Sequence, residues 1–154
     1  MEIHDLLSPE GVIANLKAAG KKQALQELAA KVSKLAGVNE RLVFDTLLER
    51  ERLGSTGVGH GIAIPHGKLK DVRRMTGLFA RAPQPIAFDA IDDVPVDLFF
   101  VLLAPESAGA DHLKALARVS RLLRDRVMCE KLRATDSADA LYALLTETAA
   151  SQAA

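Results

Sequence analysis

The chain has 154 residues, which predicts one domain built around one hydrophobic core. Lysine plus arginine and aspartate plus glutamate each total 20, and the net charge near zero gives no electrostatic case for binding nucleic acid. A hydrophobic content of 49% argues against general disorder, and the single cysteine excludes an intrachain disulfide. No apolar run is long enough to cross a bilayer and no signal peptide is recognisable, so we expect a soluble cytoplasmic protein.

The first half of the chain predicts a short strand, two helices and a glycine-rich loop. Residues 12–16 favour a short strand. Apolar residues at helical spacing over 25–35 predict a helix with Gly37 as its C-cap. Asn39 is a typical N-cap for a second helix that runs through Leu48, closes over 49–52 and is broken by Gly54. Three glycines and two hydroxyls then fall within the loop 54–59.

The second half alternates strands with helices. We expect strands at 62–64 and 76–81, a turn at Pro83 and Pro85, and an edge segment over 85–89. The strongest strand covers 96–103, where continuous apolarity predicts burial on both faces. Helices follow near Asp111, over 127–132 and after Ser137 as N-cap, and residues 149–154 favour a frayed tail. The predicted inward stripe of the first of these helices is Leu113, Leu116, Ala117, Ser120 and Leu123.

This order of elements predicts an α/β fold. We expect a mixed central β-sheet with helices on both faces. The sequence contains neither an internal repeat nor a low-complexity linker, which agrees with a single unit over residues 1–154.

The segment from Gly59 to Gly67 is the most informative part of the sequence. Its apolar run 62–64 indicates a buried strand that Pro65 ends, so we expect His66 where that strand gives way to a loop. Gly67 has no Cβ, and a bulky group can therefore approach the imidazole closely. A ring nitrogen held in this way suits nucleophilic catalysis. The pattern also fits a histidine that only ends a strand and hydrogen-bonds a carbonyl.

His112 is a second candidate. It lies at a predicted helix start after the strong 96–103 strand, so both histidines are expected at one end of the sheet, where open α/β sheets bind ligands. The free backbone N–H groups of a helix start attract phosphate. The alternative is a solvated residue at a helix start.

Arg52, Ser55 and Thr56 form a third group around the glycine-rich loop. Backbone N–H groups in such a loop can surround an oxyanion, and arginine can hold a phosphate with two hydrogen bonds. The loop lacks the lysine of the nucleotide-binding phosphate loop. An ordinary flexible turn explains the loop equally well. His4 and His60 are expected to be exposed, Cys129 is expected to be a small apolar helix residue, and the histidine spacing predicts no metal site.

The run from Glu51 to Lys68, ERLGSTGVGHGIAIPHGK, resembles the active-site signature of the type-two IIA proteins of the bacterial phosphotransferase system. The mannitol, fructose and nitrogen-related branches share that signature. The start of the run, together with AFDAID at 87–92 and PVDL at 95–98, favours the nitrogen-related branch. The resemblance covers about 6–145. One departure is His60, where relatives often carry asparagine, and a third histidine near the site is expected to alter local titration.

The resemblance implies a role for each candidate. His66 matches the histidine that accepts a phosphoryl group from a small histidine phosphocarrier protein, through Nε2 in the family. His112 matches a histidine that contacts the phosphoryl group without accepting it. Arg52, Ser55 and Thr56 match the rim of the site, and backbone N–H groups around Gly67 are expected to help hold the phosphate. No metal, nucleotide or other cofactor is implied.

The same resemblance implies a mainly regulatory, phosphotransferase-like protein whose phosphorylation state is reported to partners such as potassium-transport proteins or sensor kinases. The sequence carries no recognisable permease or IIB domain, which suits a regulator that acts alone. The alternative is a sugar-specific IIA component that passes its phosphate to a IIB domain. A third hypothesis, a binding module with an inactive site, is disfavoured by the presence of both histidines.

Overall fold

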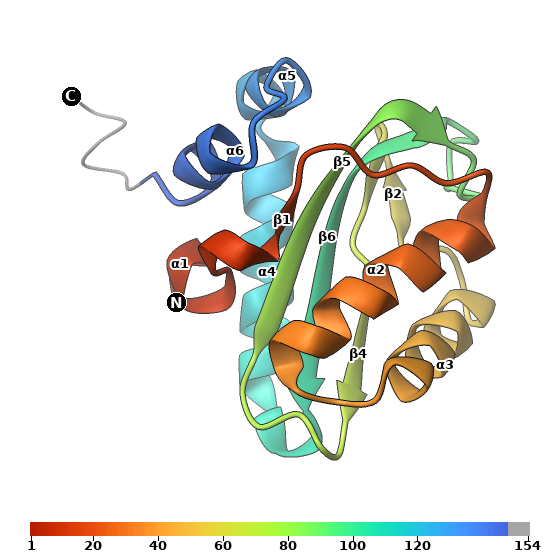
Figure 1. Ribbon diagram of the computed structural model, residues 1–154, viewed down its shortest axis with the longest axis vertical. Helices are drawn as coiled ribbons and strands as arrows, with labels where there is room; N and C mark the ends of the chain where they lie inside the picture. Colours follow the sequence, from red (N-terminus) through yellow and green to blue (C-terminus); the bar gives the residue numbers. More distant parts are fainter. Residues whose placement is uncertain (148–154) are drawn as a thin grey trace.

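The computed structural model describes residues 1–147 and has a mixed sheet of six strands at its centre (Figure 1). The strand order is β1-β5-β6-β3-β2, and β4 also pairs with β6. β5 is antiparallel to β6, whereas β3 and β4 both run parallel to it. β1 is parallel to β5, and β2 is antiparallel to β3. The strands are β1 (Val12–Ile13), β2 (Gly57–Gly59), β3 (Ile62–Ala63), β4 (His66–Leu69), β5 (Thr76–Ile86) and β6 (Val96–Pro105).

Helices cover both faces of this sheet, as the sequence predicted. α2 (Lys21–Ala36) and α3 (Glu40–Arg52) pack on one face, in front of the sheet in Figure 1. The other face carries α1 (Ile3–Leu6), α4 (Ala110–Arg124), α5 (Arg126–Arg133) and α6 (Ala138–Leu145). Two short 3-10 turns, Pro9–Gly11 and Glu106–Ala108, complete the described elements.

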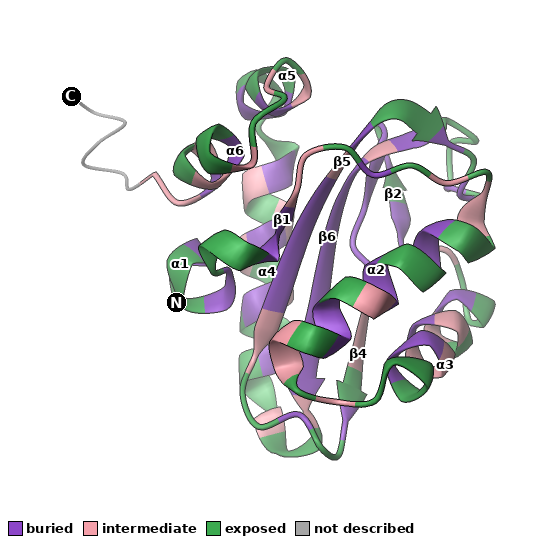
Figure 2. Cartoon of the chain, viewed as in Figure 1, coloured by how far each residue is buried: buried purple, intermediate pink, exposed green. Residues whose placement is uncertain are grey.

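The central strand β6 contributes to both hydrophobic cores. Its side chains alternate, with Leu98, Phe100 and Leu102 in the core under α4 and with Phe99, Val101 and Leu103 in the core under α2 and α3. None of these six residues has measurable exposure, and Figure 2 shows the strand buried along its length. The continuous apolar run therefore indicated burial on both faces correctly.

The predicted helix ends are confirmed by their capping geometry. Gly37 adopts φ 69° after α2, the left-handed conformation that glycine tolerates best. The Asn39 side chain accepts a hydrogen bond from the Leu42 amide at 3.1 Å, and the Ser137 hydroxyl accepts one from the Ala140 amide at 3.3 Å. α3 ends at Arg52, within the predicted closing segment 49–52, and Gly54 at φ 148° then turns the chain away.

Two strand predictions are corrected. The turn expected at Pro83 and Pro85 lies inside β5, which leaves its register with β6 after Arg81 and rejoins it at Ile86. Proline is tolerated there because the irregular stretch requires no ladder N–H. His66 begins β4 rather than a loop, because the chain pairs with β6 again directly after Pro65, opposite Leu102.

The inward stripe predicted for α4 is also corrected. The buried residues of this helix are His112, Ala115, Val119 and Leu123. Leu113 is 68% exposed, so the helix is rotated by about one residue from the expected orientation. No described helix has the length and apolarity that crossing a membrane requires. The predicted tail at 149–154 lies outside the described residues.

Candidate functional site

The site is centred on His66, where β4 begins against the central strand. The Pro65 carbonyl accepts a hydrogen bond from the Leu102 amide at 3.0 Å, and His66 lies opposite Leu102 in parallel register. The interruption at Pro65 therefore does not release the chain from the sheet. His66 is held on a paired strand, with its ring partly buried.

Two contacts fix the imidazole of His66. Its Nδ1 lies 2.7 Å from the Ile64 carbonyl oxygen, which can only accept a hydrogen bond. Nδ1 therefore carries the proton, and Nε2 keeps its lone pair. Arg50 Nε donates to that Nε2 at 3.3 Å, which agrees with this tautomer. The free nitrogen faces a guanidinium group.

Arg50 is itself held in place at the end of α3. Its Nη1 donates to the Gly54 carbonyl at 2.9 Å, so the guanidinium is bonded to both the helix-ending loop and the histidine. The acceptor of Arg50 Nε is His66 Nε2, a neutral ring nitrogen. A phosphoryl group at the same place would offer several anionic oxygens, and the guanidinium of Arg50 would form stronger, charge-assisted hydrogen bonds with them.

His112 lies beside His66, at the start of α4. The ring centroids are 5.7 Å apart, and the rings are inclined by 48°. His112 is 8% exposed, and its buried Nδ1 has no hydrogen-bond partner within the described part of the chain. The structure therefore brings the two predicted histidines together, and it excludes the alternative of a solvated His112.

Both histidines are biased toward the neutral form. Burial lowers the pKa of His66 below its ordinary 6.5 and is opposed by the hydrogen bond to Ile64, while Arg50 lowers it further. Burial also lowers the pKa of His112, with added repulsion from His66 and Lys68. His60 is not among the groups that shift either pKa, contrary to the expectation that it would alter local titration. At neutral pH the site thus presents a neutral imidazole beside a fixed cation.

The glycine-rich loop is anchored away from the two rings. The Ser55 hydroxyl donates to the Phe88 carbonyl at 3.2 Å and accepts from the Gly57 amide at 3.0 Å. The Thr56 hydroxyl bonds to the Glu51 carboxylate, which also accepts from the Thr56 amide at 3.0 Å. Within residues 1–147, neither hydroxyl forms a hydrogen bond with His66 or His112. Both serve the loop itself.

Glu51 is the buried centre of that loop anchor. Its side chain is 2% exposed, and Lys21 Nζ on α2 lies 3.0 Å from its Oε1. The carbonyl of the anchored Thr56 accepts from the Ile64 amide at 3.0 Å, and the Ile64 carbonyl faces the His66 ring. An unbroken series of hydrogen bonds therefore connects Glu51 to the reactive ring.

Arg52 lies elsewhere. Its guanidinium pairs with Glu49 on the outer surface, where the two side chains are 64% and 68% exposed, and in the described chain it forms no hydrogen bond with His66. The residue that meets the ring is Arg50. Helical periodicity was the missed signal, because the buried face Val43, Phe44 and Leu47 continues to positions 50 and 51 and not to 52.

Gly67 has a packing role beside His66. A Cβ at this position would lie 2.6 Å from Cγ2 of Thr46, so the glycine allows α3 to approach β4. That approach places the end of α3, and with it Arg50, against the site. Within residues 1–147, no three His, Cys, Asp or Glu side chains come together as a metal site.

Comparison with known proteins shows the family of the chain. The family model of the phosphoenolpyruvate-dependent sugar phosphotransferase system, EIIA 2, matches residues 5–148. A nitrogen regulatory protein of Bradyrhizobium diazoefficiens is 59% identical over 145 residues, which cover 94% of this chain and 95% of that protein.

Two solved structures are similar over most of the chain. The nitrogen regulatory protein IIA-Ntr of Neisseria meningitidis has a TM-score of 0.88 and 35% identity, and the match covers 94% of this chain and 99% of that one. Enzyme IIAMTL of Escherichia coli, in its complex with phosphorylated enzyme IIBMTL, has a TM-score of 0.77 and 26% identity. That match covers 91% of this chain and 98% of the other.

Proposed function

We propose that this chain, which belongs to the EIIA type-two family of the phosphotransferase system and within it to the nitrogen regulatory IIA proteins, is a phosphoryl-accepting regulator. In this proposal a histidine phosphocarrier protein donates a phosphoryl group to His66 in the cytoplasm. Partner proteins then respond to the phosphorylation state. The observation that carries the proposal is the unprotonated Nε2 of His66, whose lone pair has a single, long hydrogen bond from Arg50 at 3.3 Å.

The transfer requires little covalent chemistry from the protein. The lone pair of Nε2 attacks phosphorus, the new N–P bond forms, and the N–P bond to the donor histidine breaks with its electron pair returning to the donor. Positioning and neutralisation of the phosphoryl oxygens supply most of the catalysis in such reactions. Arg50 is placed to transfer its hydrogen bond from Nε2 to those oxygens as the N–P bond forms. His112 would contact the phosphoryl group, and its buried Nδ1 has no hydrogen-bond partner among residues 1–147.

The Ile64 carbonyl has the complementary task. Once Nε2 bonds to phosphorus, the ring gains positive character, and the acceptor at Nδ1 stabilises it while preserving the ring orientation. The exposed apolar side chains at the rim, Leu113 beside His112 and Leu53 at the end of α3, offer contact area for the phosphocarrier. Regulated partners such as potassium-transport proteins or sensor kinases would read the added dianion as a change of surface charge.

Phosphate acceptance tests the proposal. The protein is incubated with phosphoenolpyruvate, the first enzyme of the system and its phosphocarrier, and an acid-labile mass gain is localised by mass spectrometry. We expect the gain on His66, its absence in His66→Ala, and slowed but measurable acceptance in His112→Ala. Absence of the gain in the wild type, with another IIA protein phosphorylated in parallel, would reject the proposal in favour of a binding module with an inactive site.

A second function, a sugar-specific IIA component, is favoured by one observation. The similar IIAMTL was solved in complex with a phosphorylated IIB enzyme. Transfer from phosphorylated protein to a purified IIB domain discriminates between the two. Rapid loss of phosphate to the IIB domain would support the transport role, and stable retention supports the regulator.

A further inference from the structure

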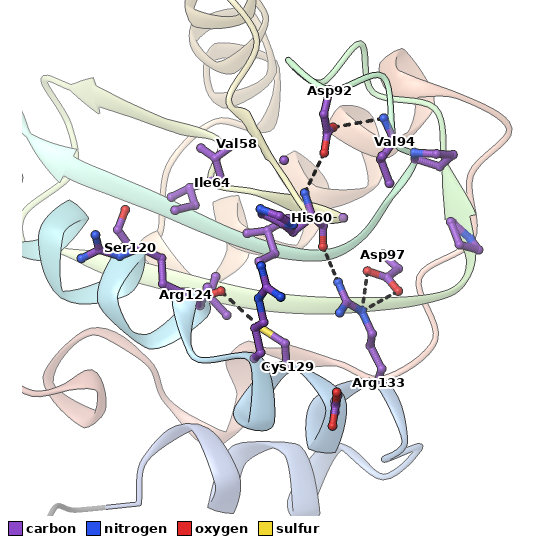
Figure 3. A pocket seen from close by; sticks show the side chains of 18 of the residues that line it. Val58, His60, Ile64, Asp92, Val94, Asp97, Ser120, Arg124, Cys129 and Arg133 are labelled. Carbon is purple, nitrogen blue, oxygen red and sulfur yellow. Dashed lines mark hydrogen bonds and ion pairs between the residues drawn. The ribbon is translucent and has the colours of Figure 1, made fainter.

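A large cavity lies beside β3, and its lining extends from the turn before that strand to Ile64 after it. It has a volume of about 1090 Å³ and opens between the β2–β3 turn, the segment before β6, and helices α4 and α5 (Figure 3). Its apolar surface includes Val58, Ile62, Ile64 and Leu123. Ligand cavities in proteins usually enclose roughly 300–1,000 Å³ and combine such apolar surface with a few polar groups. The cavity is therefore large enough for a small molecule.

The wall at the β2–β3 turn is held rigidly. His60 adopts φ 58°, a conformation rare outside glycine, and Asp92 accepts from its amide at 2.9 Å. Arg133 donates to the His60 carbonyl at 2.6 Å and also pairs with Asp97 at 2.9 Å, as Figure 3 shows. A Cβ at Gly61 would lie 2.8 Å from Arg133 Nη2, so only glycine admits this arrangement. The wall is formed before any ligand arrives.

The opposite wall is basic. One stripe of α4, made of Ala117, Ser120, Arg121 and Arg124, lines the cavity, and Arg126 follows at the start of α5. Among residues 1–147, none of these three arginines forms an ion pair with a carboxylate. Arg133 is already neutralised by Asp97. The remaining acidic groups of the lining are Asp92, whose oxygens accept from two backbone amides, and Glu130.

We propose that this cavity binds a small amphipathic anion, with an aliphatic body on the Ile62 and Leu123 side and an anionic group on Arg121 and Arg124. Guanidinium groups hold carboxylates and phosphates through paired, charge-assisted hydrogen bonds. The lining contains no phenylalanine, tyrosine or tryptophan, which favours an aliphatic body over a stacked aromatic ring. The binding itself does not depend on the proposed phosphorylation.

The cavity also touches the phosphorylation site through one residue. Ile64 lines the cavity, and its carbonyl orients the His66 ring at 2.7 Å. A ligand packed against Ile64 therefore contacts the element that sets the tautomer of His66. A ligand bound in the cavity would change the surroundings of the His66 ring. By linkage, a modification of His66 would change the affinity of the cavity for that ligand.

Titration of the unphosphorylated protein with octanoate and with octyl phosphate, followed by ¹H–¹⁵N NMR, tests the binding. We expect saturable shifts at Gly59, Gly61, Ala117 and Arg121. Octanol tests the need for charge, and inorganic phosphate tests the need for an aliphatic body. Each control should bind at least about tenfold more weakly if both halves of the ligand contribute. Equal binding of octanol and octanoate, or shifts only outside the cavity, would overturn the proposal. The two anions together show whether a carboxylate or a phosphate is preferred.

Two double variants locate the anionic group. Arg121→Gln with Arg124→Gln should weaken octanoate binding about tenfold or more, because charge-assisted hydrogen bonds are lost. Arg73→Gln with Arg74→Gln removes the same charge outside the cavity and should change the affinity less than about twofold, because only screened long-range attraction is lost. An equal loss of octanoate affinity in the two double variants would overturn the proposed site. Binding that does not shift the His66 ring ¹⁵N signals would overturn the link to Ile64.

Discussion

His60 and His66 bracket β3, and the structure holds them in opposite ways. At His60 the backbone is fixed, by Asp92 on its amide and Arg133 on its carbonyl, and the side chain is exposed. At His66 the ring is fixed, and a reactive nitrogen is left with one long contact. The Leu98 amide donates to the Gly61 carbonyl, and Leu102 lies opposite His66. Four residues of β6 therefore separate the two ends of β3, roughly 13 Å along the strand.

The difference concerns which polar groups are satisfied. Near His60 the ion pair and the turn amide have good partners, as expected where polar groups serve structure. Near His66 a buried His112 Nδ1 has none in the described residues, and Arg50 is bonded to a weak acceptor. Unsatisfied polar groups destabilise a fold, and they are retained where a ligand or a reacting group completes them.

The largest expected effect separates Arg50 from its neighbour Arg52. Arg50→Gln should slow phosphoryl acceptance by about a hundredfold, because a preorganised donor to the developing charge is lost. Arg52→Gln removes an exposed ion pair and should change the rate less than about twofold. Rates are measured by quenched-flow phosphorylation with a saturating phosphocarrier. Equal slowing by both variants would show that Arg50 has no special position.

The next effect falls on the loop anchor. Glu51→Gln removes the buried partner of Lys21, and we expect the free energy of unfolding to fall by about 2 kcal/mol, the value of hydrogen bonds to a charged group. Glu49→Gln, the matched variant at an exposed pair, should change it by less than about 0.5 kcal/mol. Urea unfolding followed by circular dichroism measures both. A loss of the same size in the two variants would contradict the distinction between buried and exposed pairs.

A smaller effect is expected at the other end of β3. Gly61→Ala places a Cβ at φ 80° against Arg133, and it should destabilise the fold by about 1–2 kcal/mol. The rate of phosphoryl acceptance per folded molecule should stay unchanged, since the site at His66 is separate. His60→Asn serves as its control, because asparagine tolerates positive φ and should retain near wild-type stability. Slowed acceptance in folded Gly61→Ala would show that the two ends are not independent.

The smallest effect concerns pH. The pKa values of His66 and His112 are lower in the folded chain than their ordinary 6.5. As the pH falls toward and below 6.5, the unfolded chain therefore binds more protons than the folded chain, and the free energy of unfolding decreases. The wild type should therefore lose more stability between pH 7.5 and 5.5 than His112→Gln, which has no proton to gain at that position. The midpoint of phosphoryl acceptance should lie below pH 6.5, because the lowered pKa of His66 keeps more of its Nε2 unprotonated at a given pH than in a free imidazole. An acceptance midpoint above pH 6.5 would contradict the lowered pKa of His66.

Local signals in the sequence predicted most of the fold. The cap at Asn39, the glycine at 37 and the apolar run in β6 each depend on nearby residues, and the structure confirms all three. The predictions that were wrong depend on distant partners. β4 forms at His66 only because β6 is available beside it, and β5 passes through two prolines because its pairing is interrupted there.

The arrangement of the candidate site was also predicted correctly where local signals in the sequence decide it, and missed where a distant partner decides it. His66 and His112 were predicted to meet because strand ends and helix starts converge at one edge of a sheet, and the structure places their rings 5.7 Å apart. The contact of Arg50 with the ring depends on which side of α3 faces β4, and that follows from the close packing of Thr46 on Gly67. Sequence motifs identified the right helix end without identifying the side chain that points inward.

The alternation of β6 between the two cores has a consequence for how the molecule opens. Neither helical layer can be detached without exposing alternate side chains of one strand, so the two layers form a single cooperative unit. Amide hydrogens of β6 should therefore exchange with solvent only through global unfolding, at one shared and slowest rate. Stability lost in either layer then shortens the lifetime of the whole native state, including the strand against which His66 is held.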